Sequence, residues 1–468
     1  MEEHNPHAKK WKKDQKKIAL AYPNFYRAGI ANIGLQQIYA EINALDEYIC
    51  ERFYSDVFNG EKSVESGDSI SDFDRSFFSL QYEEDYPQAI RMAQSARKSV
   101  AGGPCVMENP VPLSNFFESF FIGEVDGLVS GILKGNSIRG LMDGDTHKVK
   151  RSWAKLEDHF RHQIIGEGAY GRSLLLEVGR GCRRKCRFCL VRQLYRPCRW
   201  REVDDLLEVA EEGKKLTHKA ALIAPSVGDH PRIKDLIFQL VDMGFMVSPS
   251  SLRADTVDEE LMGLLSRAGL KSMTIAPEAG SQRMREVIKK EIGEEDILNT
   301  VELASSSSIQ RIKLYFMVGL PNESEEDIKA ILDVVDKVNH KIPQVSVSIN
   351  PMVPKPHTPF QWLPFGGNFS LNPQENIKEL NKKFKFLRKE LKRRKVEVET
   401  GSVKKFALQT ITSRGDEKVG KALPRIRVKD FEEYLGEFDV DEQLPWDFID
   451  HGYRKSTLIK EFEAVQEI

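Results

Sequence analysis

Short apolar runs followed by polar loops recur through the middle of the chain. Each run has the length of a strand, and the residues before the next run leave room for a helix. The runs span residues 174–178, 220–224, 246–248, 272–276, 312–318 and 345–349. Strands that alternate with helices favour a parallel sheet. The pattern therefore predicts six βα units over residues 166–396, arranged as a partial (βα)6 barrel similar to a TIM barrel.

A second alternating pattern precedes the first. Strand-like runs lie at residues 18–22, 77–80, 101–104 and 120–123, and apolar residues at helical spacing lie at 33–42 and 128–133. This order predicts an N-terminal α/β domain over residues 17–135, built on a doubly wound parallel sheet. Residues 136–165 are charged and contain the turn residues Gly140, Gly144 and Asp145, so they predict a linker.

The last part of the chain, residues 397–468, is predicted to form a small α+β extension. Within it, residues 403–411 have the apolar content of a strand, and residues 458–465 show helical spacing. We expect this extension to close the barrel.

The composition narrows the class of protein. The 468 residues are 40% hydrophobic and 30% charged, and the formal net charge is −2. This balance gives no global field that would attract nucleic acid or a membrane surface. No apolar run is long enough to span a bilayer, and the lysine-rich N-terminus lacks the apolar segment of a signal peptide. We therefore expect a cytoplasmic protein without a membrane partner.

The most specific chemistry lies directly after the first predicted barrel strand. Cys182, Cys186 and Cys189 follow the spacing CxxxCxxC in one loop. Thiolates suit iron–sulfur clusters, and three of them would hold three irons of a cubic cluster and leave the fourth iron open. A structural zinc site needs four ligands, commonly from two pairs of residues. A closed cluster would need Cys198 as its fourth ligand, and this alternative stays open.

This loop, with Phe188 before its last cysteine, resembles the cluster loop of the radical S-adenosylmethionine (SAM) superfamily. The resemblance implies one 4Fe–4S cluster held by the three cysteines, with SAM at the open iron. It also implies an enzyme that cleaves SAM reductively to a 5′-deoxyadenosyl radical, which acts on a substrate that the sequence does not identify. A low-potential electron donor such as ferredoxin or flavodoxin is the implied partner.

Other candidate SAM-binding residues lie where barrel strands end, the edge at which such barrels carry their chemistry. Glu278, in Pro-Glu-Ala-Gly-Ser, resembles a superfamily element whose carboxylate accepts hydrogen bonds from the ribose hydroxyls. Ser226 or Asp229 would contact the SAM amino group. Gly319, in Met-Val-Gly-Leu-Pro, resembles the element that backs the adenine.

Four further residues are weaker candidates. Ser251 and Arg253 follow the third strand, and Arg253 would pair with the SAM carboxylate or a substrate anion. Lys313, on the fifth strand, is a catalytic candidate close to SAM or substrate. His357 lies in a proline-fixed loop similar to the Pro-x-x-Thr-Pro segment of methylthiotransferases and is a candidate proton carrier. Each of the last three also has a purely structural explanation. Arg253 could form an ion pair at a helix start, and Lys313 could pack its aliphatic stem and extend its amine to solvent. His357 could belong to a rigid loop that closes the end of the barrel.

The N-terminal region resembles the cobalamin-binding-like domains that precede some radical SAM cores. The likeness rests on residues 21–24, Gly29 and residues 32–35. In such domains a loop histidine often ligates cobalt, but the loop over residues 24–29 contains no histidine. Ligation by histidine is therefore not supported. A degenerate domain is favoured, and cobalamin bound without histidine stays open.

RNA is a further candidate substrate, because residues 374–395 hold ten basic and three acidic residues. A solvated outer helix face with cations near its C-terminus explains the same pattern. Three alternatives to the general assignment stay open: an RNA-modifying enzyme similar to the methylthiotransferases, a cobalamin-dependent methyltransferase, and a non-catalytic iron–sulfur scaffold or electron carrier.

Overall fold

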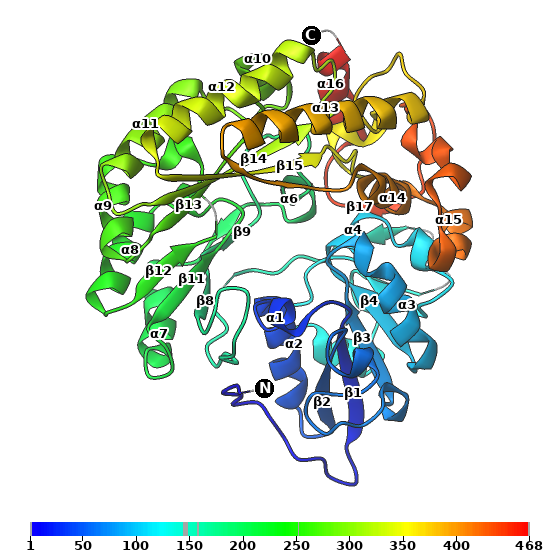
Figure 1. Ribbon diagram of the computed structural model, residues 1–468. Helices are drawn as coiled ribbons and strands as arrows, with labels where there is room; N and C mark the ends of the chain where they lie inside the picture. Colours follow the sequence, from blue (N-terminus) through cyan, green and yellow to red (C-terminus); the bar gives the residue numbers. More distant parts are fainter. Residues whose placement is uncertain (1, 144–147, 157–158, 251, 467–468) are drawn as a thin grey trace.

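The N-terminal part of the chain forms one six-stranded sheet (Figure 1). In the computed structural model, which describes residues 2–143, 148–156, 159–250 and 252–466, the strand order is β2-β1-β3-β4-β5-β6. The first five strands are parallel, and β6 pairs antiparallel with β5. The strands are β1 (Lys16–Tyr22), β2 (Tyr48–Tyr54), β3 (Arg75–Ser79), β4 (Ser99–Gly102), β5 (Ser119–Phe121) and β6 (Leu141–Met142). The predicted doubly wound sheet is confirmed.

Helices cover both faces of this sheet, so alternate residues of β1 enter two different cores. Ala19 and Ala21 pack into the core that contains α3 (Tyr86–Ser95). Ile18 and Leu20 pack into the core that contains α2 (Ile33–Asn43). The remaining helices of this region are α1 (Tyr26–Gly29), α4 (Pro104–Glu108) and α5 (Val129–Leu133).

The strand β2 was not among the predicted strands. All seven of its residues are buried, although Glu51 and Arg52 interrupt its apolar run. The Arg52 guanidinium is paired with the carboxylates of Glu3 and Glu65, which explains how a cation occupies a buried strand.

The middle of the chain forms two parallel sheets that continue one another. The first has the order β12-β11-β8 and the second β13-β14-β15-β16, and a parallel bridge between Leu252 and Ile275 joins them. The strands are β8 (Leu174–Glu177), β11 (Lys219–Ile223), β12 (Met246–Pro249), β13 (Ser272–Glu278), β14 (Arg311–Val318), β15 (Gln344–Pro351) and β16 (Glu397–Thr400). The six predicted strands are therefore all present, and β16 adds a seventh at the edge.

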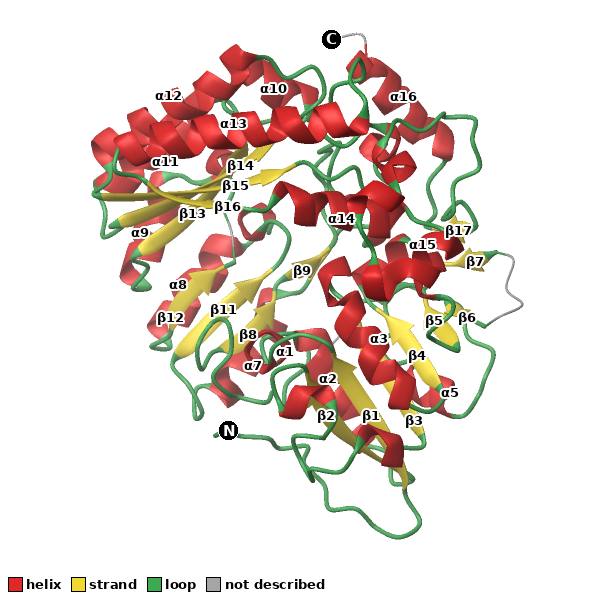
Figure 2. Ribbon diagram, turned by 45° about the vertical axis from the view of Figure 1, so that its right-hand side comes forward, coloured by secondary structure: helices red, strands yellow, loops and turns green. Residues whose placement is uncertain are grey.

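Helices lie on the outer side of this arc of strands (Figures 1 and 2). They are α7 (Val203–Gly213), α8 (Ile233–Asp242), α9 (Glu259–Arg267), α10 (Gln282–Val287), α11 (Glu294–Ser305), α12 (Glu325–Lys341) and α13 (Pro373–Arg393). The basic helix α13 buries one stripe and exposes most of its lysines, with Lys383 half-buried. Several of its cations pair with carboxylates, including Lys383 with Glu323 and Arg394 with Asp336. These pairs agree with the structural alternative for this helix.

The C-terminal extension contains α14 (Val403–Arg414), α15 (Glu417–Ala422), β17 (Ile449–Asp450) and α16 (Lys455–Gln466). The predicted strand at residues 403–411 is wrong, because this segment is the helix α14. The helix buries Ala407 and Ile411 on one side and Thr412 and Ser413 beside them, so apolar residues are not confined to one stripe. This broad burial hid the helical period.

The predicted linker is partly built into the fold. Its strand β7 (Val149–Lys150) pairs in parallel with β17 of the C-terminal extension. Gly140 adopts a φ of +92°, which suits a turn at glycine. Gly144 and Asp145 lie outside the described residues.

Candidate active site

The cysteine loop connects two short paired strands. β9 (Gly179–Arg180) precedes the loop and pairs antiparallel with β10 (Arg199–Trp200), which follows it. Gly181 starts the loop with a φ of +79°, and a Cβ atom there would lie 2.3 Å from the carbonyl oxygen of Tyr195. A glycine is therefore required at this position, since the returning chain passes directly against it.

The three predicted ligand cysteines lie near one another in this loop, and their role as ligands remains a prediction. Burial, followed by the neighbouring thiols of Cys186 and Cys182, raises the pKa of Cys189 to about 12. Burial also raises the pKa of Cys186, while Lys290 and Arg253 oppose that shift. Three converging thiols in a partly cationic setting fit a cluster bound by thiolates, because the bound metal deprotonates the ligands and the cations balance their charge.

The geometry does not form a site for a single ion. Among the described residues, no three His, Cys, Asp or Glu side chains are arranged so that they could hold one metal ion.

Cys198 lies close to the cluster loop because it directly precedes β10. Burial raises the pKa of its thiol, and the neighbouring thiol of Cys182 raises it as well. The Cα atom of Cys198 would lie 3.2 Å from a Cβ atom at Gly181. The closed cluster with Cys198 as fourth ligand therefore stays a structural alternative.

Phe188, the aromatic residue before the last cysteine, is half-buried against the main core. The short helix α6 (Val191–Leu194) begins directly after the loop. The backbone of Arg187 donates a hydrogen bond to the Ile288 carbonyl at 3.0 Å, and the Arg187 side chain donates one to the Val287 carbonyl at 2.7 Å. These contacts anchor the loop to the segment that follows α10.

Glu278 lies at the end of β13 and faces the same cysteines. Its φ of +67° is unusual for a residue with a side chain, so the backbone there is strained. Its carboxylate pairs with Lys290 at 3.1 Å, and its charge acts on Cys186. Lys290 was not among the predicted site residues, because its position depends on the fold of the segment after α10.

Arg253 is buried and already has partners. Its guanidinium pairs with Asp255 at 2.9 Å and donates a hydrogen bond to the Lys290 carbonyl at 2.8 Å. These contacts agree with its structural alternative, the ion pair at a helix start, and they also place its charge beside Cys186. Its predicted role toward SAM remains a prediction. Ser251 lies outside the described residues.

Asp229 and Ser226 lie in the loop after β11. Burial favours a higher pKa for Asp229, but hydrogen bonds from Arg184 outweigh it and lower the pKa. Arg184 also pairs with Asp255 at 2.9 Å, so it links Asp229 to the loop that carries Arg253. The buried Ser226 hydroxyl lies beside the Asp229 carboxylate and also lowers the pKa of Asp229.

Gly319 follows β14 with a φ of +86°, and a Cβ atom there would lie 2.8 Å from Leu380. Its backbone N–H donates to the Glu323 carboxylate at 2.9 Å. The close approach explains the glycine, and its predicted role beside the adenine remains a prediction. Lys313 lies nearer the start of the same strand and pairs with Glu399 at 2.6 Å, so the structure does not bring it to Glu278.

His357 is buried between the N-terminal domain and the C-terminal extension. The Tyr453 hydroxyl donates to its Nδ1 at 2.5 Å, and its Nε2 donates to the Glu108 carbonyl at 2.9 Å. Burial, followed by the effect of His451, holds the pKa of His357 well below its usual value. The neutral ring thus joins two parts of the fold. Its predicted role in proton transfer remains a prediction.

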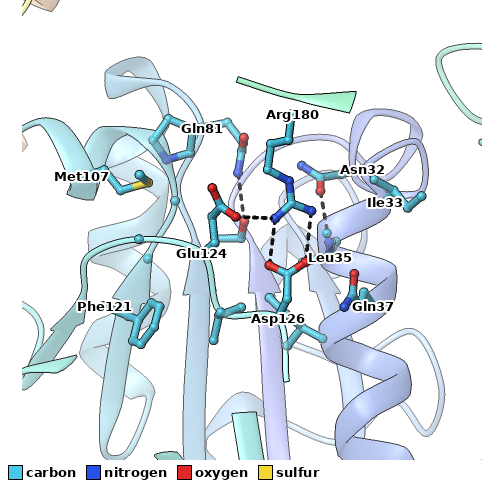
Figure 3. A pocket seen from close by; sticks show the side chains of 18 of the residues that line it. Asn32, Ile33, Leu35, Gln37, Gln81, Met107, Phe121, Glu124, Asp126 and Arg180 are labelled. Carbon is cyan, nitrogen blue, oxygen red and sulfur yellow. Dashed lines mark hydrogen bonds and ion pairs between the residues drawn. The ribbon is translucent and has the colours of Figure 1, made fainter. Parts of the chain in front are cut away.

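A cavity of about 410 Å³ separates the N-terminal sheet from the cysteine loop. Its walls come from strand ends of both regions and from α2, and it is lined largely by apolar side chains. Figure 3 shows Arg180 of β9 reaching into it, where the guanidinium pairs with Asp126 at 2.9 Å and Glu124 at 3.0 Å. Glu124 and Asp126 come shortly after β5, and this position after a strand is the sequence signal that could have marked them as site residues.

The charges around Arg180 are balanced. Burial opposes the ionised form of Glu177, but Arg180 and Arg201 outweigh it and lower the pKa of Glu177 to about 2. The Arg180 pKa is raised, since Glu177 and Asp126 outweigh the opposing effect of burial. This ion-paired network links the N-terminal domain to the first barrel strand.

Comparison with known proteins identifies the family. The model of the radical SAM superfamily matches residues 176–335, and the model of the N-terminal region of radical SAM proteins matches residues 34–157. An uncharacterized protein of Methanocaldococcus jannaschii, MJ0966, is 41% identical over 454 residues, which cover 91% of this chain and 97% of the relative. The chain belongs to the radical SAM superfamily and is an enzyme whose substrate is not identified.

Two further relatives show the range of this superfamily. A putative methylthiotransferase of the same organism, MJ0865, is 25% identical and spans 57% of this chain and 64% of its own. The structure of TsrM, a radical SAM methyltransferase from Kitasatospora setae with cobalamin and a [4Fe-4S] cluster bound, has a TM-score of 0.56 at 13% identity and covers 74% of each chain. This likeness supports the fold. No helix in the described part of the chain has the length and apolar character to cross a membrane.

Proposed function

We propose that Cys182, Cys186 and Cys189 hold one 4Fe–4S cluster with an open iron, and that SAM binds between this loop and the end of β13. When bound, the cluster and SAM supply the reductive cleavage of SAM to methionine and a 5′-deoxyadenosyl radical that abstracts hydrogen from a substrate. The observation that carries this proposal is the convergence of three thiols with Glu278, Lys290 and Arg253 at one end of the barrel.

The chain's own residues would bind and orient SAM. The Glu278 carboxylate would accept hydrogen bonds from the ribose hydroxyls, and its ion pair with Lys290 would hold it in place. The Ser226 hydroxyl, beside Asp229, would accept a hydrogen bond from the SAM amino group. Gly319 would let the backbone approach the adenine. We also propose that the chain divides after residues 135, 165 and 396 into an N-terminal domain, a linker, a barrel and a C-terminal extension.

The test of this proposal is anaerobic formation of 5′-deoxyadenosine, measured by mass spectrometry after the cluster is reconstituted and SAM and a reductant are added. We expect the wild-type protein to form it. The Cys198→Ser variant should keep its iron and stay within about twofold of wild type, because the proposal gives Cys198 no ligand role. Loss of iron in this variant, with no 5′-deoxyadenosine formed by wild type either, would favour the closed cluster of an electron carrier.

A second candidate function rests on the interdomain cavity. Its 410 Å³ falls in the range of cofactor sites, and it lies directly beside the cysteine loop. No histidine is present among its described lining residues, so cobalt would receive no imidazole from this wall. We propose that cobalamin, if it binds this protein, enters here without histidine ligation. The protein would then be a methyltransferase, as TsrM is.

Cobalamin binding is expected to depend on the apolar wall of this cavity. Replacing Ile33, which lines it, by tryptophan would fill part of the space and should weaken binding about tenfold or more. The measurement is a titration with hydroxocobalamin, followed by absorption after gel filtration. Leu216→Trp is the control, because Leu216 does not line the cavity. Equal retention of cobalamin by both variants, or no retention by wild type, would remove this candidate.

A further inference from the structure

A second cavity, of about 430 Å³, opens beside the cysteine loop and is strongly basic. Cys186 forms part of its wall, and neither Glu278 nor Lys290 lines it. Two adjacent lysines point to different sides of the loop. Lys290 pairs with Glu278 in the proposed SAM site, while Lys289 pairs with Glu461 of α16 at 2.6 Å in the wall of the second cavity. The cavity is therefore distinct from the proposed SAM site, although both adjoin Cys186.

The charge of this second cavity is one-sided. Its lining contains five cations and one carboxylate; the cations are Lys185, Arg192, Arg196, Lys289 and Arg454. The carboxylate, Glu461, is engaged by Arg187 at 3.0 Å as well as by Lys289. This local excess of positive charge contrasts with a net charge of −2 for the whole chain.

Several of these cations are free to meet a partner. Lys185, Arg196 and Arg454 are exposed, and no carboxylate of the described residues lies within ion-pair distance of them. A cluster of unpaired cations raises the local concentration of anionic partners and orients their approach. Tyr453 and Leu458 give the cavity a small apolar floor between these charges.

We infer that this basic rim is the docking surface for an acidic, low-potential electron-transfer protein of the flavodoxin or ferredoxin kind. The inference rests on the proposed function, since it assigns a surface to the reductant that a cluster on Cys186 requires. One electron would pass from the carrier, which is oxidised, to the bound cluster, which is reduced, and no bond forms or breaks. Weak electron-transfer complexes bury little area, so steering by charge contributes much of their association rate.

The position of Cys186 is the reason for choosing a protein reductant over an RNA. A docked carrier would place its redox centre against the wall that holds a cluster ligand, and transfer needs that short path. An RNA strand would gain nothing from Cys186 and would be expected to follow the exposed lysines of α13 instead. Binding of RNA at this rim is therefore an outcome that the experiment must detect.

The test uses the reconstituted protein and the double variant Arg196→Glu/Arg454→Glu. We expect its affinity for a purified flavodoxin, measured anaerobically at low ionic strength, to fall about 10-fold or more. The rate of cluster bleaching by reduced flavodoxin should fall by a similar factor. Bleaching by photoreduced deazaflavin, a small neutral reductant, should stay within about twofold of wild type because it needs no docking.

Lys389→Glu/Lys392→Glu is the matched control, since it makes the same charge change on exposed lysines of α13. This variant should keep flavodoxin affinity within about twofold of wild type. Equal flavodoxin affinity in the rim variant and wild type would overturn the docking proposal, as would a rim variant that loses polyuridylate binding and keeps flavodoxin binding. Failure of deazaflavin to reduce even the wild-type cluster would count against the proposed function, while the affinity data would still decide the docking.

Discussion

Replacing Cys186 by alanine is expected to abolish cleavage of SAM. Its thiol is one of three that converge at the loop, and a cluster with two protein ligands is held weakly. We expect iron after reconstitution to fall from about four atoms per chain to near background. Formation of 5′-deoxyadenosine should fall about 100-fold or more, as measured by mass spectrometry under reducing, anaerobic conditions.

The control for this experiment is Cys50→Ser. Cys50 is buried in β2 of the N-terminal sheet, so this change alters a thiol that the account leaves outside the site. Iron content and product should remain within about twofold of wild type in the soluble fraction of this variant. A Cys186→Ala protein that retains both full iron and SAM cleavage would show that the cluster is held elsewhere.

Replacing Glu278 by glutamine is expected to weaken SAM binding about 10-fold to 100-fold. The carboxylate is held at the end of β13 by strained backbone and by Lys290, and hydrogen bonds to a charged group contribute roughly 1.5–3 kcal/mol. Glutamine keeps the volume and the acceptor oxygen but removes the charge. The measurement is calorimetric titration of the reconstituted protein with SAM, with iron content determined on the same sample.

Glu399→Gln is the matched control for this second prediction. It removes a carboxylate that pairs with Lys313 away from the cysteines, so SAM affinity should not change. If the Glu278 variant binds SAM as tightly as wild type, the ribose assignment is wrong and Glu278 serves to hold Lys290. A loss of iron in the Glu278 variant would instead assign it to the stability of the cysteine loop.

Local spacing explains which parts of the site could be predicted. The three cysteines lie within one short loop, so their meeting needs no knowledge of the rest of the fold. Glu278 ends β13 and Asp229 lies in the loop after β11, and parallel strands bring such residues to one edge. The six barrel strands were predictable for the same reason, since each is an apolar run that ends in a polar loop.

Tertiary contacts explain what could not be predicted. Arg52 lies in a buried strand only because Glu3 and Glu65 come to it from other segments. The role of His357 depends on Tyr453 and on the Glu108 carbonyl, which are distant in the chain. The segment at residues 403–414 is a helix buried on more than one side, so its apolar residues show no clear helical period.

The interdomain cavity and the basic cavity also depend on contacts between segments that are distant in the chain. Arg180 meets Glu124 and Asp126 across more than fifty residues of sequence, and the basic rim combines the cysteine loop with the start of α16. No local sequence pattern predicts contacts between residues so far apart in the chain. They arise when the N-terminal sheet and the C-terminal extension pack against the barrel.

The measurement that tests the central claim most directly is the electron paramagnetic resonance spectrum of the reduced, reconstituted protein before and after SAM is added. A cluster held by Cys182, Cys186 and Cys189 has an open iron, so SAM is predicted to change the g values of the signal. An unchanged spectrum at saturating SAM, with full iron content that depends on Cys198, would contradict the account and identify a closed cluster.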